Sequence, residues 1–240
     1  MKSIEMTEVI EIEHSNNQKG KTAIRIVRSN TARRLSLRID PHLGIAKIIA
    51  PKRVSLKKMR AFVNDKITWI LDELANLPPQ KFLIHNHEVP ILGVPHTIVH
   101  CPEARRGVWC EDNNIYVSGL SEHVERRVHD WLKFKAKSTI TPLAMCYAAI
   151  INENINGITI KSTKSRWGSC SSTGRISFTW HLIMTPEKVL KYVIAHEVCH
   201  LKEFNHSEGF WTLVENTFGK SEAEKMWLKK NGPHLYRYVY

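Results

Sequence analysis

The chain has 240 residues, of which 42% are hydrophobic and 24% are charged, and its formal net charge is +12. These fractions are typical of a soluble globular protein with one large domain or two small ones. No apolar run reaches the roughly 20 residues that a membrane-spanning helix needs, so we expect no membrane partner. The net charge favours an anionic partner, either nucleic acid or a phosphate-bearing substrate, but a solvated basic surface explains it equally well.

The cellular compartment is predicted from the N-terminus and the cysteines. Residues 1–5 contain no apolar segment and no small-residue cleavage site, so we expect no secretion signal. The cysteines are odd in number, scattered and free of any C-x-x-C pair, which is typical of reduced thiols and predicts a cytoplasmic protein. They are Cys101, Cys110, Cys146, Cys170 and Cys199.

The first half of the chain is predicted to be rich in strands. Alternating or continuous apolar residues, punctuated by glycine, proline and asparagine, indicate short strands. These strands cover residues 4–13, 22–28, 35–39, 45–50, 82–84, 89–92 and 96–100, with a hairpin over 108–117. One long helix interrupts them, from Ser55 as its N-cap to about residue 77, where Pro78 and Pro79 end it. We therefore expect residues 1–120 to form a β-rich N-terminal region with one long helix at about residues 55–77.

The second half, residues 121–240, is predicted to form an α+β domain. A long helical pattern runs from Ser121 to Ile151, and Pro142 makes it either one kinked helix or two abutting helices. Strands at residues 158–161 and 175–180 flank a stretch of small residues around Arg166 and Trp167, which suggests backbone that turns or passes close to another group. Three further helices then begin near residues 185, 207 and 221.

A metal-binding motif is indicated where the chain reads His196-Glu197-Val198-Cys199-His200. On a helix, residues four apart share one face, so the imidazoles of His196 and His200 can both reach one metal ion. Glu197 stands beside this pair, where its carboxylate can take a proton from a water that the metal activates. The sequence therefore predicts His196 and His200 as metal ligands and Glu197 as the catalytic residue.

The third predicted ligand is His206, which lies six residues after His200. A helix that ran straight on would not bring it back to the first two histidines, so the chain must turn between them. Asn205 is the residue best suited to the left-handed conformation that ends a helix. Three protein ligands with an open fourth position are typical of catalytic zinc, whereas structural zinc usually has four. We therefore predict one Zn²⁺ ion.

The alternative interpretation of the motif is an ordinary helix with two histidines and a surface glutamate. The context favours the metal interpretation, because the motif lies on a predicted amphipathic helix and a third histidine follows at a plausible distance. Cys199 falls on the far flank of the histidine face, and we interpret it as a buried packing thiol rather than a ligand.

These motifs resemble the YgjP-like metallopeptidases, a branch of the zincins related to the SprT-like and WLM groups. The resemblance is dense over residues 158–212 and looser over the N-terminal strands. It rests on Lys164-Ser165-Arg166-Trp167-Gly168-Ser169-Cys170-Ser171, on residues 176–180, on residues 196–206, and on Ser207, Phe210 and Trp211. It implies a zincin-like fold, with a small sheet, an active-site helix beneath it and an edge strand along the cleft. The spacing of the histidines also matches the metzincins, but Glu203 stands where they have glycine, and no Met-turn follows His206.

Several residues are candidates for contact with a substrate. By the resemblance, residues 175–180 form the strand beside the substrate, which makes Ser177 and Phe178 candidate substrate-binding residues. Arg166 is interpreted either as a clamp for a substrate carboxylate or phosphate or as half of a structural ion pair. Trp167 is either a substrate platform or, as we favour, a packing residue. Glu203, Asn205 and Glu208 are candidates for a side chain that orients a ligand imidazole, and the sequence does not choose among them.

The predicted function is hydrolysis of a peptide or protein substrate by a zinc metallopeptidase, with Glu197 as general base. One alternative, which the resemblance also carries, is a nucleoside triphosphate pyrophosphatase that acts on UTP at the same metal. Activated water attacks phosphorus as well as carbonyl carbon, and the basic surface would suit a triphosphate, but no glycine-rich phosphate loop is recognised. A second alternative is a basic module that binds DNA or a protein.

Overall fold

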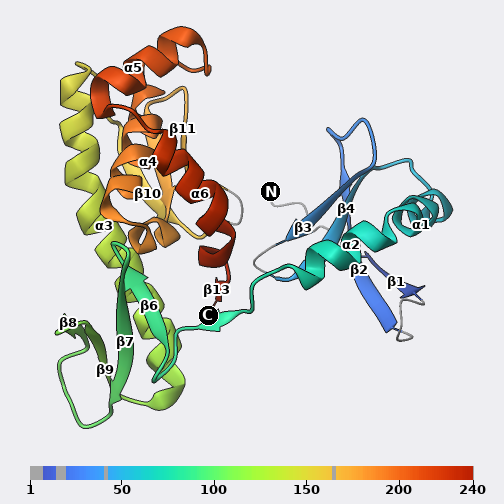
Figure 1. The fold of residues 1–240 in the computed structure, drawn as a ribbon, viewed down its shortest axis with the longest axis horizontal. Coiled ribbons are helices and arrows are strands. Elements are labelled where there is room, and N and C mark those ends of the chain that lie inside the picture. The colour runs from blue at the N-terminus through green and yellow to red at the C-terminus, as the bar shows by residue number, and fades with distance from the viewer. Residues whose placement is uncertain (1–7, 15–19, 41–42, 164–165, 240) are drawn as a thin grey trace. The chain divides into compact units, whose positions relative to one another are not determined.

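The computed structural model describes residues 8–14, 20–40, 43–163 and 166–239. The chain divides into two compact units, Met1–Pro79 and Gln80–Tyr240 (Figure 1). This division differs from the boundary after residue 120 that the sequence pattern favours. The reason is the core: the strands between residues 88 and 118 bury Ile98 and Ile115 in the same apolar cluster as Val128 and Val198.

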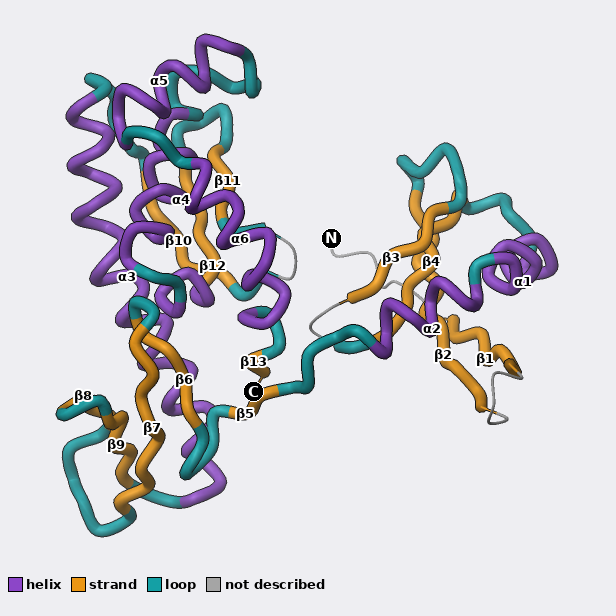
Figure 2. Tube along the Cα trace, in the orientation of Figure 1, coloured by secondary structure: helices purple, strands orange, loops and turns teal. Residues whose placement is uncertain are grey.

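The first unit contains one four-stranded sheet and two helices (Figure 2). The strands are β1 (Glu8–His14), β2 (Gly20–Ser29), β3 (Ser36–Asp40) and β4 (Ile45–Pro51). They lie in the order β1-β2-β4-β3, with β2 parallel to β4 and the other two pairs antiparallel. The predicted strands are therefore present, and residues 4–7 of the first one lie outside the described residues.

The single helix predicted at about residues 55–77 is wrong, because two helices cover this stretch. They are α1 (Leu56–Asp65) and α2 (Ile67–Ala75), and they meet at Lys66. A straight helix over 55–77 would be about 35 Å long, whereas four strands side by side span only about 15 Å. The break lets Ile70 of α2 join Met59 and Val63 of α1 in one buried cluster.

The second unit begins with a second four-stranded sheet. A short strand β5 (Lys81–Phe82) precedes it, and its members are β6 (Glu88–Ile91), β7 (Val94–Cys101), β8 (Val108–Glu111) and β9 (Asn114–Ser118). Their order is β6-β7-β9-β8, and β8 and β9 form the predicted hairpin. The turn between these two strands holds Asp112 and Asn113 at positive φ, the conformation that short polar turn residues tolerate best.

One helix, α3 (Val124–Ile150), connects this sheet to the rest of the second unit (Figure 1). A short helical turn, η1 (Ser121–His123), precedes it. Pro142 lies within α3, so a single helix replaces the two abutting helices that the proline also allowed. The helix buries a stripe of small and branched side chains that includes Val128, Leu132, Ala136 and Ile140.

The remaining elements surround a small three-stranded sheet. They are β10 (Gly157–Lys161), β11 (Gly168–Cys170), β12 (Arg175–Thr179), η2 (Trp180–Met184), α4 (Glu187–Cys199), α5 (Glu208–Phe218), α6 (Glu222–Leu235) and β13 (Tyr238–Val239). The strand order is β10-β12-β11, so β12 is central and β11 is an edge. Strand β13 pairs with β5 in a separate two-stranded sheet.

The mixture of helices with small separate sheets confirms the predicted α+β class. Within the described residues, no helix combines the length and the apolar character needed to cross a membrane. The five cysteines are free, and Cys199 is fully buried, as expected of a packing thiol.

Candidate metal centre

Helix α4 carries the first two histidines into the centre of the second unit. Most of its side chains are buried, and it contacts α3, α5, α6 and β11. His196 lies in its last turn, and His200 is its C-cap residue, with φ −67° and ψ −10°. The burial of α4 on several sides fixes the positions of both imidazoles, because the helix cannot rotate without disturbing the core.

The chain turns after α4 and brings His206 back to the helix. Backbone amides of Leu201 and Glu203 donate to the carbonyls of Val198 and Cys199, which closes the end of the helix. The prediction that Asn205 adopts a left-handed conformation is wrong, since its φ is not positive. Its side-chain oxygen instead accepts a hydrogen bond from the Ser207 amide at 3.1 Å, so the turn is stabilised through a side chain.

The three histidines converge on one point. Each of His196, His200 and His206 offers a ring nitrogen, and these nitrogens all lie within 4.8 Å of one another. The Nε2 atoms of His196 and His206 are 3.1 Å apart. His206 is exposed, whereas the other two imidazoles are partly buried. The structure therefore brings together all three predicted ligands, with access from solvent on the His206 side.

Two aromatic residues of α5 hold the imidazoles in place. The ring of Phe210 stacks on His200 with centroids 4.4 Å apart and contacts the other two histidines at 4.8 and 5.0 Å. Trp211 lies against His196 and His206 at 5.8 and 5.6 Å. The sequence analysis identified both only as part of the family resemblance and gave them no role at the metal, although they follow His206 by four and five residues.

The environment keeps the buried imidazoles neutral. Burial lowers the pKa of His196 to about 3, and the neighbouring His200 and His206 lower it further. Burial also lowers the pKa of His200. The Nδ1 atom of His200 lies 2.8 Å from the backbone carbonyl of Glu203, which places a proton on Nδ1 and leaves Nε2 as an acceptor. His200 is thus oriented by a main-chain carbonyl and not by the side chain of one of the three candidates.

Glu197 lies where α4 crosses the edge strand β11. The carboxylate is buried, and burial raises its pKa to about 7, against an opposing effect of the Arg166 guanidinium. Its side chain lies against Gly168: a Cβ at that position would be 2.8 Å from Oε1. The residue is therefore a carboxyl group that changes protonation near neutral pH, in the turn of α4 that carries His196.

Arg166 and Trp167, the two candidate residues that precede β11, lie in different environments. Arg166 is exposed, and its charge lowers the pKa of Glu197, so it lies on the side of the candidate site. Trp167 packs on Gly232 of α6 and on Tyr236, with ring centroids 4.9 Å apart, which favours the packing interpretation. Lys164 and Ser165, quoted in the resemblance, lie outside the described residues.

The structure does not place Ser177 and Phe178, the candidate substrate-binding residues, on an exposed edge of the sheet. Both lie on β12, which is the central strand, and both are buried. The Ser177 hydroxyl is 2.9 Å from the hydroxyl of Ser169 on β11, so it is occupied within the sheet. The strand beside Glu197 is β11, which the sequence did not predict as a strand because it has only three small residues.

Comparisons with known proteins identify a family for most of the chain. A family model described as YgjP-like, metallopeptidase domain, matches residues 33–231. No curated protein matches the chain. Two solved structures show limited similarity: the metallopeptidase zymogens abylysin of Pyrococcus abyssi and jannalysin of Methanocaldococcus jannaschii. The first is 23% identical with a TM-score of 0.35 and covers 39% of this chain and 92% of its own. The second is 30% identical with a TM-score of 0.33 and covers 38% and 92%.

Proposed function

The chain belongs to the YgjP-like metallopeptidase family, and from this premise we propose that it is a zinc-dependent peptidase. The observation that carries the proposal is the convergence of His196, His200 and His206 beside the buried carboxyl group of Glu197. We propose that the three imidazoles hold one zinc ion and leave a fourth position open, as in catalytic zinc sites.

The donor set fits zinc. Imidazole nitrogen is a preferred zinc ligand, with Zn–N bonds of about 2.0–2.1 Å. A separation of 3.1 Å between the Nε2 atoms of His196 and His206 is compatible with two such bonds to one ion. The lowered pKa of His196 and of His200 leaves both rings with a lone pair at neutral pH, which metal binding requires.

The catalytic proton transfer is assigned to Glu197. A zinc ion held by the three imidazoles supplies a Lewis acid that makes water more acidic and a carbonyl more electrophilic. The Glu197 carboxylate accepts the proton of the attacking water and then donates it to the leaving amine. A carboxyl group whose pKa is raised to about 7 suits both steps, because neither protonation state is strongly disfavoured at neutral pH.

The substrate is proposed to lie along β11. Among the residues that the structure describes, this strand pairs with β12 alone, so its other edge offers backbone groups to an extended peptide. Gly168 on this strand borders Glu197, so a peptide along the edge passes the catalytic carboxyl group. Arg166 precedes the strand and is exposed, and we propose that it binds a carboxylate of the substrate.

A Glu197→Gln variant tests the proposal, with the exposed Glu208→Gln as the matched control. Purified protein is expected to contain one zinc ion per chain and to cleave peptides. Glu197→Gln should keep the zinc and lose at least about 100-fold in kcat. Glu208→Gln should keep both the zinc and the activity. Peptide cleavage by Glu197→Gln at the wild-type rate would refute the assigned role.

The same assay separates the alternatives. Hydrolysis of UTP without peptide cleavage would identify a nucleotide pyrophosphatase, and absence of both activities in zinc-loaded protein would favour a binding module for DNA or a protein.

We also propose a cytoplasmic location, which the five free cysteines support.

A further inference from the structure

The positive charge of the chain is concentrated in one short stretch. Residues 20–66 contain thirteen lysines and arginines but only two acidic residues, which gives them a formal net charge of +11. The rest of the chain is nearly balanced, at +1. All strands of the first unit except β1, together with helix α1, lie within this stretch. The charge is therefore densest in the first unit: residues 1–79 carry a formal net charge of +7, against +5 for the twice longer second unit.

Three of these cations form a row across the sheet. Arg25 on β2 is paired with Lys47 on β4, and Lys47 is paired with Arg38 on β3. Residues that are paired across neighbouring strands lie on the same face, and adjacent strands are about 4.8 Å apart. Lys47 forms an ion pair with the buried Asp40, so two flanking arginines carry the excess charge of the row.

The row lies on the face of the sheet opposite the two helices. The helices bury Ile24 and Ile26 of β2 and Ile48 of β4 against Met59 and Val63. Arg25 and Lys47 alternate with these residues along the same strands, so they point away from the helices. Arg38 is exposed, and Arg25 and Lys47 are half-buried. Within the described residues of this unit, no helix packs on the face of the row.

We infer that this face binds the phosphate backbone of a nucleic acid, without sequence specificity. A row of like charges on neighbouring strands is repulsive by itself, and phosphates spaced along a strand are complementary to it. The two arginines offer planar forks that suit phosphate oxygens. Among its described side chains, the face also offers Val9, Val27, Ile49 and the exposed Glu11 on β1. It offers no aromatic ring on which bases would stack, which favours backbone contacts over base recognition.

A lipid surface is disfavoured by the same observations. Proteins that lie on membranes combine basic residues with apolar side chains that insert between lipids. In this unit the exposed Trp69 is on α2, which packs on the other face of the sheet. Among the described side chains on the face with the row, the exposed large apolar residue is Val9, one small anchor beside Arg25.

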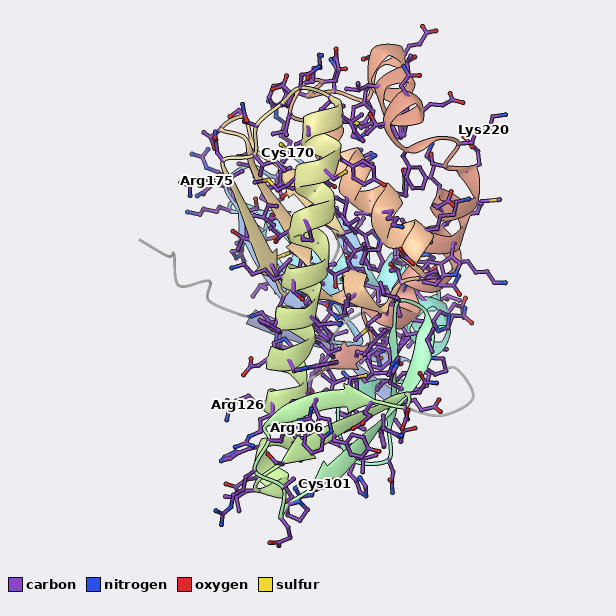
Figure 3. The ribbon with its side chains drawn as sticks, turned by 90° about the vertical axis from the view of Figure 1, so that its left-hand side faces the viewer. Cys101, Arg106, Arg126, Cys170, Arg175 and Lys220 are labelled. Atoms are coloured by element: carbon purple, nitrogen blue, oxygen red, sulfur yellow. The ribbon has the colours of Figure 1, made fainter. Side chains whose placement is uncertain are left out.

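The test is binding of a labelled 20-nucleotide single strand and of its duplex to the full chain, followed by fluorescence anisotropy over a salt series. The test variant is Arg25→Glu/Arg38→Glu, which leaves the contact of Lys47 with Asp40 in place. A Glu-Lys-Glu row alternates in sign, so the sheet should fold at least as well as in the wild type. The control is Arg105→Glu/Arg175→Glu, which makes the same charge change at exposed arginines of the second unit. Figure 3 labels Arg175 of this control pair. It also labels Arg106, the neighbour of Arg105 in the sequence, and Arg126, and both lie well apart from Arg175 along the second unit.

The test variant should bind at least tenfold more weakly at low salt, and the control should change by less than about threefold. The slope of log Kd against log salt should fall by about 1.4–1.8 in the test variant, as expected for two lost phosphate contacts. Arg25→Lys/Arg38→Lys should retain most of the binding, because charge is preserved. Thermal unfolding of each variant checks that the first unit is intact.

Three outcomes would overturn the inference. They are equal weakening by both glutamate pairs, equal competition by polyglutamate of the same total charge, and stronger binding to anionic lipid vesicles than to either oligonucleotide. Peptide hydrolysis by the test variant should be unchanged, so failure of this inference is distinguishable from failure of the proposed peptidase function.

Discussion

The side chain of Glu197 lies directly against the backbone of Gly168. A Cβ at Gly168 would stand 2.5 Å from Cγ of Glu197 and 2.7 Å from Cδ. Helix α4 and strand β11 therefore approach so closely that only a glycine fits between them. The contact holds the carboxyl group in one position, because the glutamate is buried and has little room to move.

A Gly168→Ala substitution is expected to displace Glu197 and reduce kcat by at least about tenfold, since misplacement of a catalytic group by one ångström is costly. Zinc content should be unchanged, because the substitution leaves the three histidines in place and the atoms that a Cβ at residue 168 meets first belong to Glu197. Gly209→Ala is the matched control, since a Cβ there meets nothing closer than 3.8 Å. Activity assays with metal analysis check the prediction, and full activity in Gly168→Ala would contradict it.

Zinc is expected to stabilise the protein. A ligand that binds only the folded state at 100 times its Kd adds about 2.7 kcal/mol, which corresponds to a rise in Tm of about 5–10 °C. Chelation should reverse this rise, and His200→Ala should abolish it. His87→Ala, at an exposed histidine outside the cluster, should leave the zinc-dependent shift as in the wild type. A shift that persists in His200→Ala would place the zinc elsewhere.

His129 is expected to reduce stability in acid. It is buried edge-on against Trp180, with ring centroids 5.0 Å apart. Burial, and secondarily the charge of Lys133, lower its pKa from 6.5 to about 4, while Asp130 opposes the shift. The unfolded chain therefore takes up the proton first as the pH falls, so stability is lost between about pH 6.5 and pH 4, by up to about 3 kcal/mol.

Urea unfolding at several pH values measures this effect. His129→Phe keeps an aromatic ring against Trp180 and removes the titration, so its unfolding free energy should fall less steeply below pH 6.5. The exposed His123→Phe is the control and should follow the wild-type slope. Equal slopes for all three proteins would show that His129 does not titrate in this range.

Because Trp167 contacts Gly232, we expect replacement of this helical glycine by alanine to destabilise the protein, although such a replacement usually stabilises a helix. Alanine in place of a helical glycine usually adds about 0.5–1 kcal/mol. At Gly232 a Cβ would stand 3.0 Å from Cζ2 of Trp167, whose ring is also packed on Tyr236. Gly232→Ala should therefore destabilise the protein by about 1 kcal/mol, the cost of a mildly overpacked core.

Denaturant midpoints test this as a double-mutant cycle. In a Trp167→Leu background the smaller side chain leaves room, so Gly232→Ala should become neutral or stabilising. Independent, additive effects of the two substitutions would mean that Trp167 and Gly232 are not in contact.

The metal centre was the most predictable part of the molecule, because its geometry is local. The spacing of His196 and His200 on one helix fixes their common face, and a turn of a few residues is enough to return His206. The family was also predictable, since its motifs lie in one dense stretch, and the family model confirms it. The turn itself was not predictable in detail: a hydrogen bond from the Ser207 amide to the side-chain oxygen of Asn205 replaces the expected left-handed residue.

Contacts between distant segments could not be predicted from the sequence. The small residues around Arg166 did indicate a close approach of backbone to another group, but nothing in the pattern identified that group as Glu197. The order of the strands was equally hidden: the apolar run around Phe178 suits both a central and an edge strand, and only pairing on both sides makes β12 central. The break at Lys66 depends on the width of a sheet, which no single segment encodes.

The pairing of β13 with β5 joins the two ends of the second unit. The Lys81 amide donates to the carbonyl of Arg237 at 2.9 Å, and Tyr238 lies opposite Lys81 in the parallel register. A unit whose first and last strands are neighbours can be cut out, relinked or inserted into another chain with only a short linker. The second unit is thus organised as a transferable module, and the β5–β13 pair is the place where a circular permutant would be closed.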